Sequence, residues 1–137
     1  MEQPTNVDEV FNKLKADFDK SDDFKVAHGT VTIELFKSGE EGQKVVKEKI
    51  DGMEETQLKE LALFRLANLI YDETKDVDGA VLYAEKIKDE SEVSRCLVQL
   101  ASAVFQGEND EDKADEIVAR IKDDSKGYKG FYEKLKK

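Results

Sequence analysis

The sequence contains an internal repeat with a period of 34 residues, and this repeat restricts the possible folds more than any other feature. Ile87-Lys88-Asp89 recurs 34 positions later as Ile121-Lys122-Asp123. Residues 61–90 align with residues 95–124 without a gap, and nine of the thirty aligned positions are identical. Average amino-acid frequencies give about two identities by chance. We therefore expect two equivalent structural units that pack against each other.

Each copy of the repeat is predicted to contain two helices. Leu66 and Ile70, for example, lie four positions apart and therefore share one helical face. Similar spacing of apolar residues predicts helices over residues 7–18, 45–50, 56–72, 80–87, 93–105, 110–121 and 128–135. Residues 22–37 are also predicted to be helical, although Val31–Leu35 alternates like a strand, because no partner strand is evident. Pro4 precedes all of these segments and breaks none of them.

Polar side chains mark the predicted starts of several helices. Asn6 is expected to cap the first helix, and Glu9, three residues later, completes a capping-box pattern. Ser91 is expected to cap the helix over residues 93–105, and the next helix is expected to begin near Asp110. Such side chains accept hydrogen bonds from the backbone N–H groups that a helix leaves unsatisfied at its start.

A period of 34 residues with two helices per unit resembles the tetratricopeptide repeat (TPR). Leu66-Ala67-Asn68-Leu69-Ile70-Tyr71 is similar to the first-helix motif of that family, and Ala80 with Tyr83-Ala84 is similar to the second-helix motif. The resemblance covers about residues 56–124. The turn between the helices is one residue longer than the family pattern, and the proline that usually follows the second helix is missing. The resemblance implies an all-α fold of stacked antiparallel helical hairpins, that is, a TPR-like α-solenoid.

The whole chain, residues 1–137, is expected to form one domain of such units. The expected parts are an N-terminal helix in residues 1–20, a degenerate repeat in residues 22–55, repeats in residues 56–90 and 91–124, and a capping helix in residues 125–137. Three units satisfy the expectation that a stack of this kind needs at least three repeats to be stable.

The charge of the chain disfavours several classes of partner. The sequence has 22 Lys and Arg residues and 32 Asp and Glu residues, and its net charge is −10. Nucleic-acid binding needs a basic surface, and so does binding to anionic membranes. No apolar run approaches 18 residues, so we expect no membrane insertion. The N-terminal residues do not resemble a signal peptide, and we expect a cytoplasmic location.

No pattern in the sequence indicates catalysis, a metal site or a cofactor. His28 and Cys96 are the only histidine and the only cysteine, so the chain has neither a disulfide nor a His/Cys zinc site of its own. Cys96 aligns with Ala62 and is interpreted as a small packing residue. The acidic run 108–112 lacks the loop pattern of a calcium-binding EF-hand and is interpreted as a solvated helix cap. We therefore expect a protein that is not an enzyme.

In TPR-like stacks the first helices of successive units line a concave groove, so the resemblance implies partner-binding residues on two helices. In the first copy these residues are Phe64, Arg65, Asn68, Tyr71 and Asp72. In the second copy they are Arg95, Val98, Gln99, Ser102, Phe105 and Gln106. Aromatic residues and Arg are typical of binding hot spots. A competing interpretation is that Tyr71 and Phe105 pack between the hairpins.

The predicted function is protein–protein interaction, in an adaptor or a small assembly or secretion-type chaperone. Its partner would be a helix or an extended peptide of another protein, bound in the groove. The alternative is a structural or self-associating subunit, in which the apolar stripe of the N-terminal helix, from Val7 to Phe18, docks onto another copy.

Overall fold

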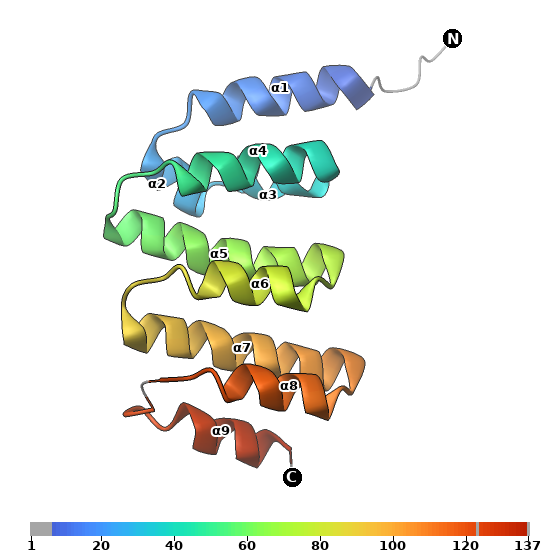
Figure 1. Cartoon of the computed structure of the whole chain (residues 1–137). Helices are drawn as coiled ribbons and strands as arrows, with labels where there is room; N and C mark the ends of the chain where they lie inside the picture. The colour runs from blue at the N-terminus through green and yellow to red at the C-terminus, as the bar shows by residue number, and fades with distance from the viewer. Residues whose placement is uncertain (1–6, 123, 137) are drawn as a thin grey trace. The chain divides into compact units, whose positions relative to one another are not determined.

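The computed structural model describes residues 7–122 and 124–136, and within these ranges all regular secondary structure is helical. The helices are α1 (Val7–Asp19), α2 (Asp23–His28), α3 (Thr30–Lys37), α4 (Glu40–Asp51), α5 (Gln57–Thr74), α6 (Val77–Ala84), α7 (Glu90–Glu108), α8 (Glu111–Val118) and α9 (Tyr128–Leu135) (Figure 1). The prediction of an all-α protein is confirmed for these residues. The predicted cap Asn6 lies outside the described residues, as does Asp123 of the repeated tripeptide.

The chain divides into two compact units, residues 1–62 and residues 63–137, and the division falls within α5. In the first unit α1 packs against α3 and α4, and α3 packs against α4. Phe18 of α1, Phe36 of α3 and Val46 of α4 are fully buried and form the centre of this unit. The Lys49 ammonium covers Phe18, with its nitrogen 4.8 Å from the ring centroid.

Residues 22–37 are helical, as predicted, but the helix is interrupted at Gly29. Gly29 has an extended backbone (φ −78°, ψ 147°) and separates α2 from α3. A side chain at this position would collide with the carbonyl oxygen of Lys25. The two short helices remain linked, because the buried Thr32 hydroxyl donates a hydrogen bond of 2.9 Å to the carbonyl oxygen of Val26.

In the second unit the 34-residue repeat is also a repeat of backbone geometry. The helices α6 and α8 have eight residues each, and their first and last residues are 34 positions apart. Each is capped by an aspartate: Asp76 accepts a hydrogen bond of 3.0 Å from Gly79 N–H, and Asp110 accepts one of 3.1 Å from Lys113 N–H. A residue in the left-handed conformation, Lys75 or Asn109, precedes each cap.

The side-chain environments of the two copies agree as well. The equivalent pairs Leu63/Leu97, Leu66/Leu100, Ala67/Ala101, Ala80/Ala114 and Ile87/Ile121 are at most 4% exposed. Alanine at the close contacts allows helix axes to approach, and the larger apolar residues fill the space between them. The two helix pairs of this unit, formed by α5 with α6 and by α7 with α8, are therefore structural duplicates within residues 63–122.

Several of the predicted helix ends are wrong. The helix α4 begins at Glu40, before the predicted segment 45–50, and α6 and α8 end at Ala84 and Val118, three residues before the predicted ends. Ser91 does not cap α7, because the helix begins at Glu90 and Asp89 accepts a hydrogen bond of 3.0 Å from Glu92 N–H. Asp89 directly precedes the first turn of α7, where its carboxylate can accept hydrogen bonds from unpaired backbone N–H groups. The acidic residues Glu90 and Glu92 in that turn also interact favourably with the positive end of the helix dipole. The helix α5 ends at Thr74 rather than near Asp72.

Candidate binding surfaces

Three of the predicted groove residues lie in the interior of the second unit. Phe64, Tyr71 and Val98 are buried. Tyr71 of α5 reaches the end of α7, where its hydroxyl donates a hydrogen bond of 3.1 Å to Oε2 of Glu108. Burial and the Glu108 carboxylate raise the pKa of Tyr71 from 10.0 to about 12. This geometry agrees with the interpretation that Tyr71 packs between the helix pairs.

Phe105 occupies the position in α7 that corresponds to Tyr71, and it is half-buried. Its ring makes an edge-to-face contact with Tyr132 of α9, with 6.3 Å between ring centroids. Its contact with α9 therefore parallels the contact of Tyr71 with α7. In both cases an aromatic residue near the end of a helix contacts the second helix after it, α7 for Tyr71 and α9 for Phe105.

The remaining predicted residues are wholly or partly accessible, and Asp72 and Gln106 among them are exposed near the ends of α5 and α7. We call the other five, Arg65, Asn68, Arg95, Gln99 and Ser102, the first-helix surface. Arg95 of α7 is held on two sides, because its guanidinium lies 4.4 Å from the centroid of the Phe64 ring and forms an ion pair of 2.7 Å with Glu92. This contact links α5 and α7 at the edge of the surface.

Two polar residues of the first-helix surface bond to their own helices. The Asn68 amide donates a hydrogen bond of 3.1 Å to the carbonyl oxygen of Phe64, and the Ser102 hydroxyl donates one of 2.8 Å to that of Val98. Asn68 and Ser102 are equivalent positions of the repeat, and so are Arg65 and Gln99, which are both exposed. The surface thus presents matched polar rows on α5 and α7.

A second candidate surface, which sequence analysis missed, is a cleft between α6 and α8. The cleft has a volume of about 310 Å³. We call it the α6–α8 cleft, and it is lined by Val77, Asp78, Val81, Leu82, Glu85, Lys113, Glu116, Ile117 and Arg120. The repeat contained a sequence feature that could have indicated this cleft, because Val81 and Leu82 align with Asp115 and Glu116. Apolar residues thus replace acids on one of two otherwise duplicated helices.

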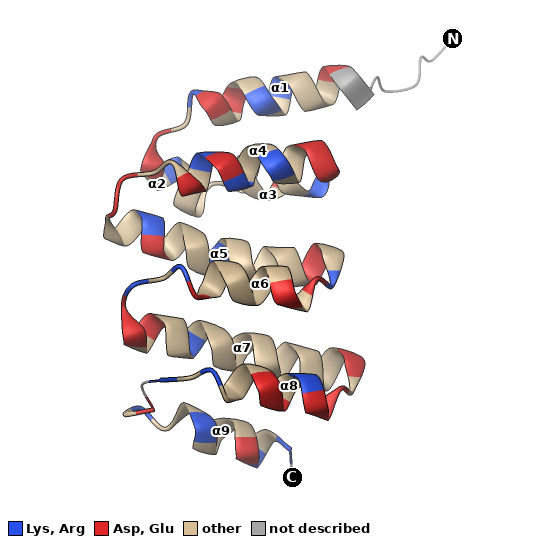
Figure 2. Ribbon diagram, in the orientation of Figure 1, with Lys and Arg blue, Asp and Glu red and all other residues tan. Residues whose placement is uncertain are grey.

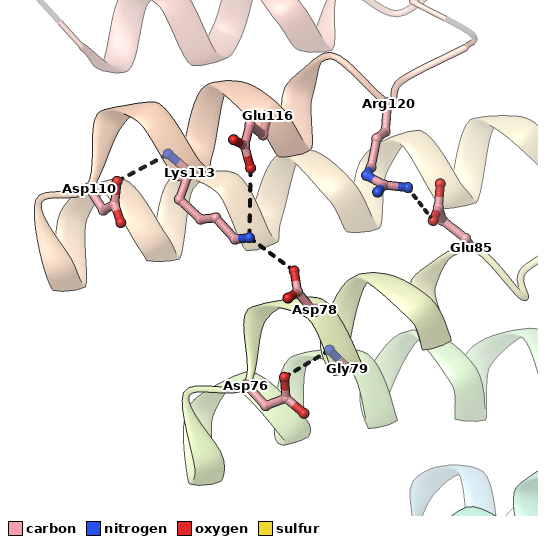
Figure 3. Close-up of polar contacts among 8 residues, drawn as sticks. All are labelled: Asp76, Asp78, Gly79, Glu85, Asp110, Lys113, Glu116 and Arg120. Atoms are coloured by element: carbon pink, nitrogen blue, oxygen red, sulfur yellow. Dashed lines mark hydrogen bonds and ion pairs between the residues drawn. The ribbon is translucent and has the colours of Figure 1, made fainter.

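Two ion pairs, Lys113 with Asp78 and Arg120 with Glu85, join the two sides of this cleft. The Lys113 ammonium lies between two carboxylates, 2.9 Å from Asp78 and 3.7 Å from Glu116, and Arg120 is 2.8 Å from Glu85 (Figure 3). The hydrogen bond to Asp78 is the main cause of the raised pKa of Lys113. Both cations lie on α8 or directly after it, and each bonds to an acid on or directly after α6.

The corresponding face of α8 is contacted by side chains from the C-terminal helix α9 and from the residue that follows it. The positions equivalent to Val77 and Val81 are Glu111 and Asp115. Lys136 forms ion pairs of 3.2 Å with Glu111 and 3.0 Å with Asp115. The fully buried Tyr132 also bonds to Asp115. Tyr132 and Lys136 therefore contact the face of α8 that repeats the cleft wall of α6, although the side chains of Glu111 and Asp115 stay 57% and 47% exposed.

The described residues contain no group of three or more His, Cys, Asp or Glu side chains placed to hold a metal ion. Cys96 is buried, and burial raises its pKa to about 12, so the thiol is a packing group rather than a nucleophile. His28 lies in ring contact with Phe24, with 4.6 Å between centroids. Within residues 7–122 and 124–136, no helix combines the length and apolar character needed to cross a bilayer.

No model of a known protein family, no curated protein sequence and no solved structure matches the chain.

Proposed function

We propose that the protein is an interaction module that binds a helix or an extended peptide of another protein on the first-helix surface. In this proposal the helix pairs stack as in a TPR-like α-solenoid, and the protein acts as an adaptor or as a small assembly chaperone. The observation that carries the proposal is the duplication itself. Arg65 and Gln99, and likewise Asn68 and Ser102, are equivalent positions of two helices whose apolar residues are buried alike.

The chemistry of this surface favours binding over catalysis. Arg and amide side chains present several hydrogen-bond donors in fixed directions, and Arg is enriched in protein-binding hot spots. The ring of Phe64 and the carboxylate of Glu92 hold the Arg95 side chain in place. A side chain that is already ordered loses less conformational entropy when a partner binds.

The test is affinity for a partner recovered by co-purification from the native cell and then verified with purified proteins. Arg65→Glu and Arg95→Glu are each expected to weaken binding by about tenfold or more, because they replace a donor with a repelling acid. Lys126→Glu makes the same charge change at an exposed loop position outside the surface and is the matched control. Unchanged affinity in both arginine variants would reject the first-helix surface as the binding site.

The second candidate function, a self-associating subunit, rests on α1 in the first unit. Val10 is 43% exposed, and Phe11 and Leu14 are only half-buried, so part of the apolar stripe of α1 is accessible. Sedimentation of the full chain and of Val10→Lys tests this function. A point substitution is preferable to removal of residues 1–20, because that removal would delete the fully buried Phe18. A monomer in both cases would exclude self-association through α1.

A further inference from the structure

The α6–α8 cleft combines an apolar floor with an unusually accessible leucine. Val81 and Ile117 form the buried floor, whereas the Leu82 side chain is 58% exposed at the edge. Covering an exposed leucine with another apolar group is favourable, because it removes apolar surface from water. Among the described residues of the second unit, packing leaves more than half of Leu82 accessible for such a contact.

The size of the cleft suits side chains rather than a whole small ligand. Its volume of about 310 Å³ is at the lower limit for small-molecule sites. At about 30 Å³ per molecule, water would fill it with roughly ten molecules. Water over an apolar floor makes few hydrogen bonds, so an apolar side chain that displaces it gains affinity. One or two aliphatic side chains of a partner are therefore the best match for this space.

The charge around the cleft identifies the kind of partner. Over residues 76–120, the acids on α6, on α8 and at their ends are Asp76, Asp78, Glu85, Asp110, Glu111, Asp112, Asp115 and Glu116, and the bases are Lys86, Lys113 and Arg120. Lys113 and Arg120 are already in ion pairs across the cleft. Figure 2 shows acidic residues along the first turns of α8. The side chains of Asp78 and Glu116 remain 88% and 70% exposed and can accept further bonds.

We infer that the α6–α8 cleft binds a basic amphipathic segment of another protein. Apolar side chains of that segment enter the cleft beside Leu82, and flanking Lys or Arg side chains pair with Asp78 and Glu116. This is a second binding activity, located on the second helices, and it is independent of the first-helix surface. A second copy of the chain is a poor occupant, because two such acidic surfaces repel each other and the net charge is −10.

A designed peptide tests the inference without a known partner. The probe has about 14 residues, roughly four helical turns, with leucines on one face and lysines on the other. A scrambled peptide of the same composition has the same charge but no apolar face. Fluorescence anisotropy of each labelled peptide against the full-length protein gives the two affinities.

Substitutions at two residues of similar exposure test whether the peptide binds in the α6–α8 cleft. Leu82→Ser removes the apolar edge of the cleft, and Phe131→Ser removes another exposed apolar side chain, 59% exposed on α9. Both positions are accessible, so both variants are expected to fold, as circular dichroism will verify. Leu82→Ser is expected to weaken binding of the amphipathic peptide about tenfold, whereas Phe131→Ser leaves it unchanged.

The remaining outcomes also decide the inference. Tight binding by the amphipathic peptide and at least about tenfold weaker binding by the scrambled one supports it, because charge attraction is the same for both. Equal binding of the two peptides, equal binding by Leu82→Ser, or no binding at all would overturn it. A dimer of the unmodified protein that Leu82→Ser dissociates would assign the cleft to a second copy instead. Arg65→Glu, which tests the first-helix surface, should leave the peptide affinity unchanged.

Discussion

The Tyr132 hydroxyl donates a hydrogen bond of 2.7 Å to Oδ1 of Asp115, and this contact joins the C-terminal helix α9 to α8. Lys136 approaches the same carboxylate oxygen at 3.0 Å. Hydrogen bonds from Tyr132 and Lys136 lower the pKa of Asp115, and burial together with Asp115 raises the pKa of Tyr132. Asp115 therefore helps to hold α9 against α8.

Asp115→Asn should destabilise the protein at neutral pH but not in acid. The pKa of the carboxyl is lower in the folded state than its ordinary value of 3.8, so its contribution is present above that value and is lost as the pH falls through the folded-state pKa. We expect the melting temperature of the variant to be a few degrees lower at about pH 7. The difference between the two proteins should shrink steadily in thermal melts as the pH is lowered below 3.8. Asp112→Asn on the same helix is the control, and an equal effect there would contradict a specific role of Asp115.

Tyr71→Phe should make the protein less sensitive to alkali. The pKa of Tyr71 is about 12 when folded and 10.0 in the reference state, so the unfolded chain ionises first as the pH rises. The stability that Tyr71 contributes is complete below pH 10.0 and is lost between these two values. Urea unfolding should show a smaller loss of stability in Tyr71→Phe than in the unmodified protein over this range. Parallel losses in both proteins would show that folding, through burial and the Glu108 carboxylate, does not raise the pKa of Tyr71.

Leu66→Ala and Leu100→Ala should destabilise the protein by similar amounts, about 2–5 kcal/mol each. The two residues are 34 positions apart and have the same burial, 2% and 1% exposed, so each truncation leaves a comparable cavity. Leu82→Ala should cost less than about 0.5 kcal/mol, since Leu82 is exposed. Denaturant titration measures all three. A large difference between Leu66→Ala and Leu100→Ala would show that the two copies are not energetically equivalent.

Lys75→Gly should stabilise the turn between α5 and α6. Lys75 has φ 58° and its equivalent, Asn109, has φ 55°, and both precede the capping aspartate of the next helix. The left-handed conformation costs an ordinary L-residue about 1 kcal/mol, whereas glycine and asparagine adopt it more easily. We expect a gain of up to about 1 kcal/mol for Lys75→Gly and a smaller change for Asn109→Gly. A loss of stability in Lys75→Gly would indicate that the contact of the Lys75 ammonium with the Tyr71 ring, 4.8 Å from its centroid, matters more.

Much of the helical structure follows from the amino-acid sequence. The spacing of apolar residues located the helices, and the repeat predicted equivalent burial of Leu66 and Leu100. These features depend on interactions between residues a few positions apart, or on the similarity of two copies, and both can be recognised in a linear sequence. The cap at Asp110 is of the same kind, because an aspartate three residues before a free N–H group is sufficient for it.

The accessible surfaces depended on how the helices pack. Periodicity indicates which face of a helix is apolar, but it does not indicate which neighbour covers that face. The predicted groove therefore included Phe64 and Tyr71, which are buried, and it omitted Leu82, which is 58% exposed. The contact between Asp115 and Tyr132 likewise arises only when α9 lies beside α8. Binding surfaces are the faces that remain after packing, and that remainder is a property of the folded chain.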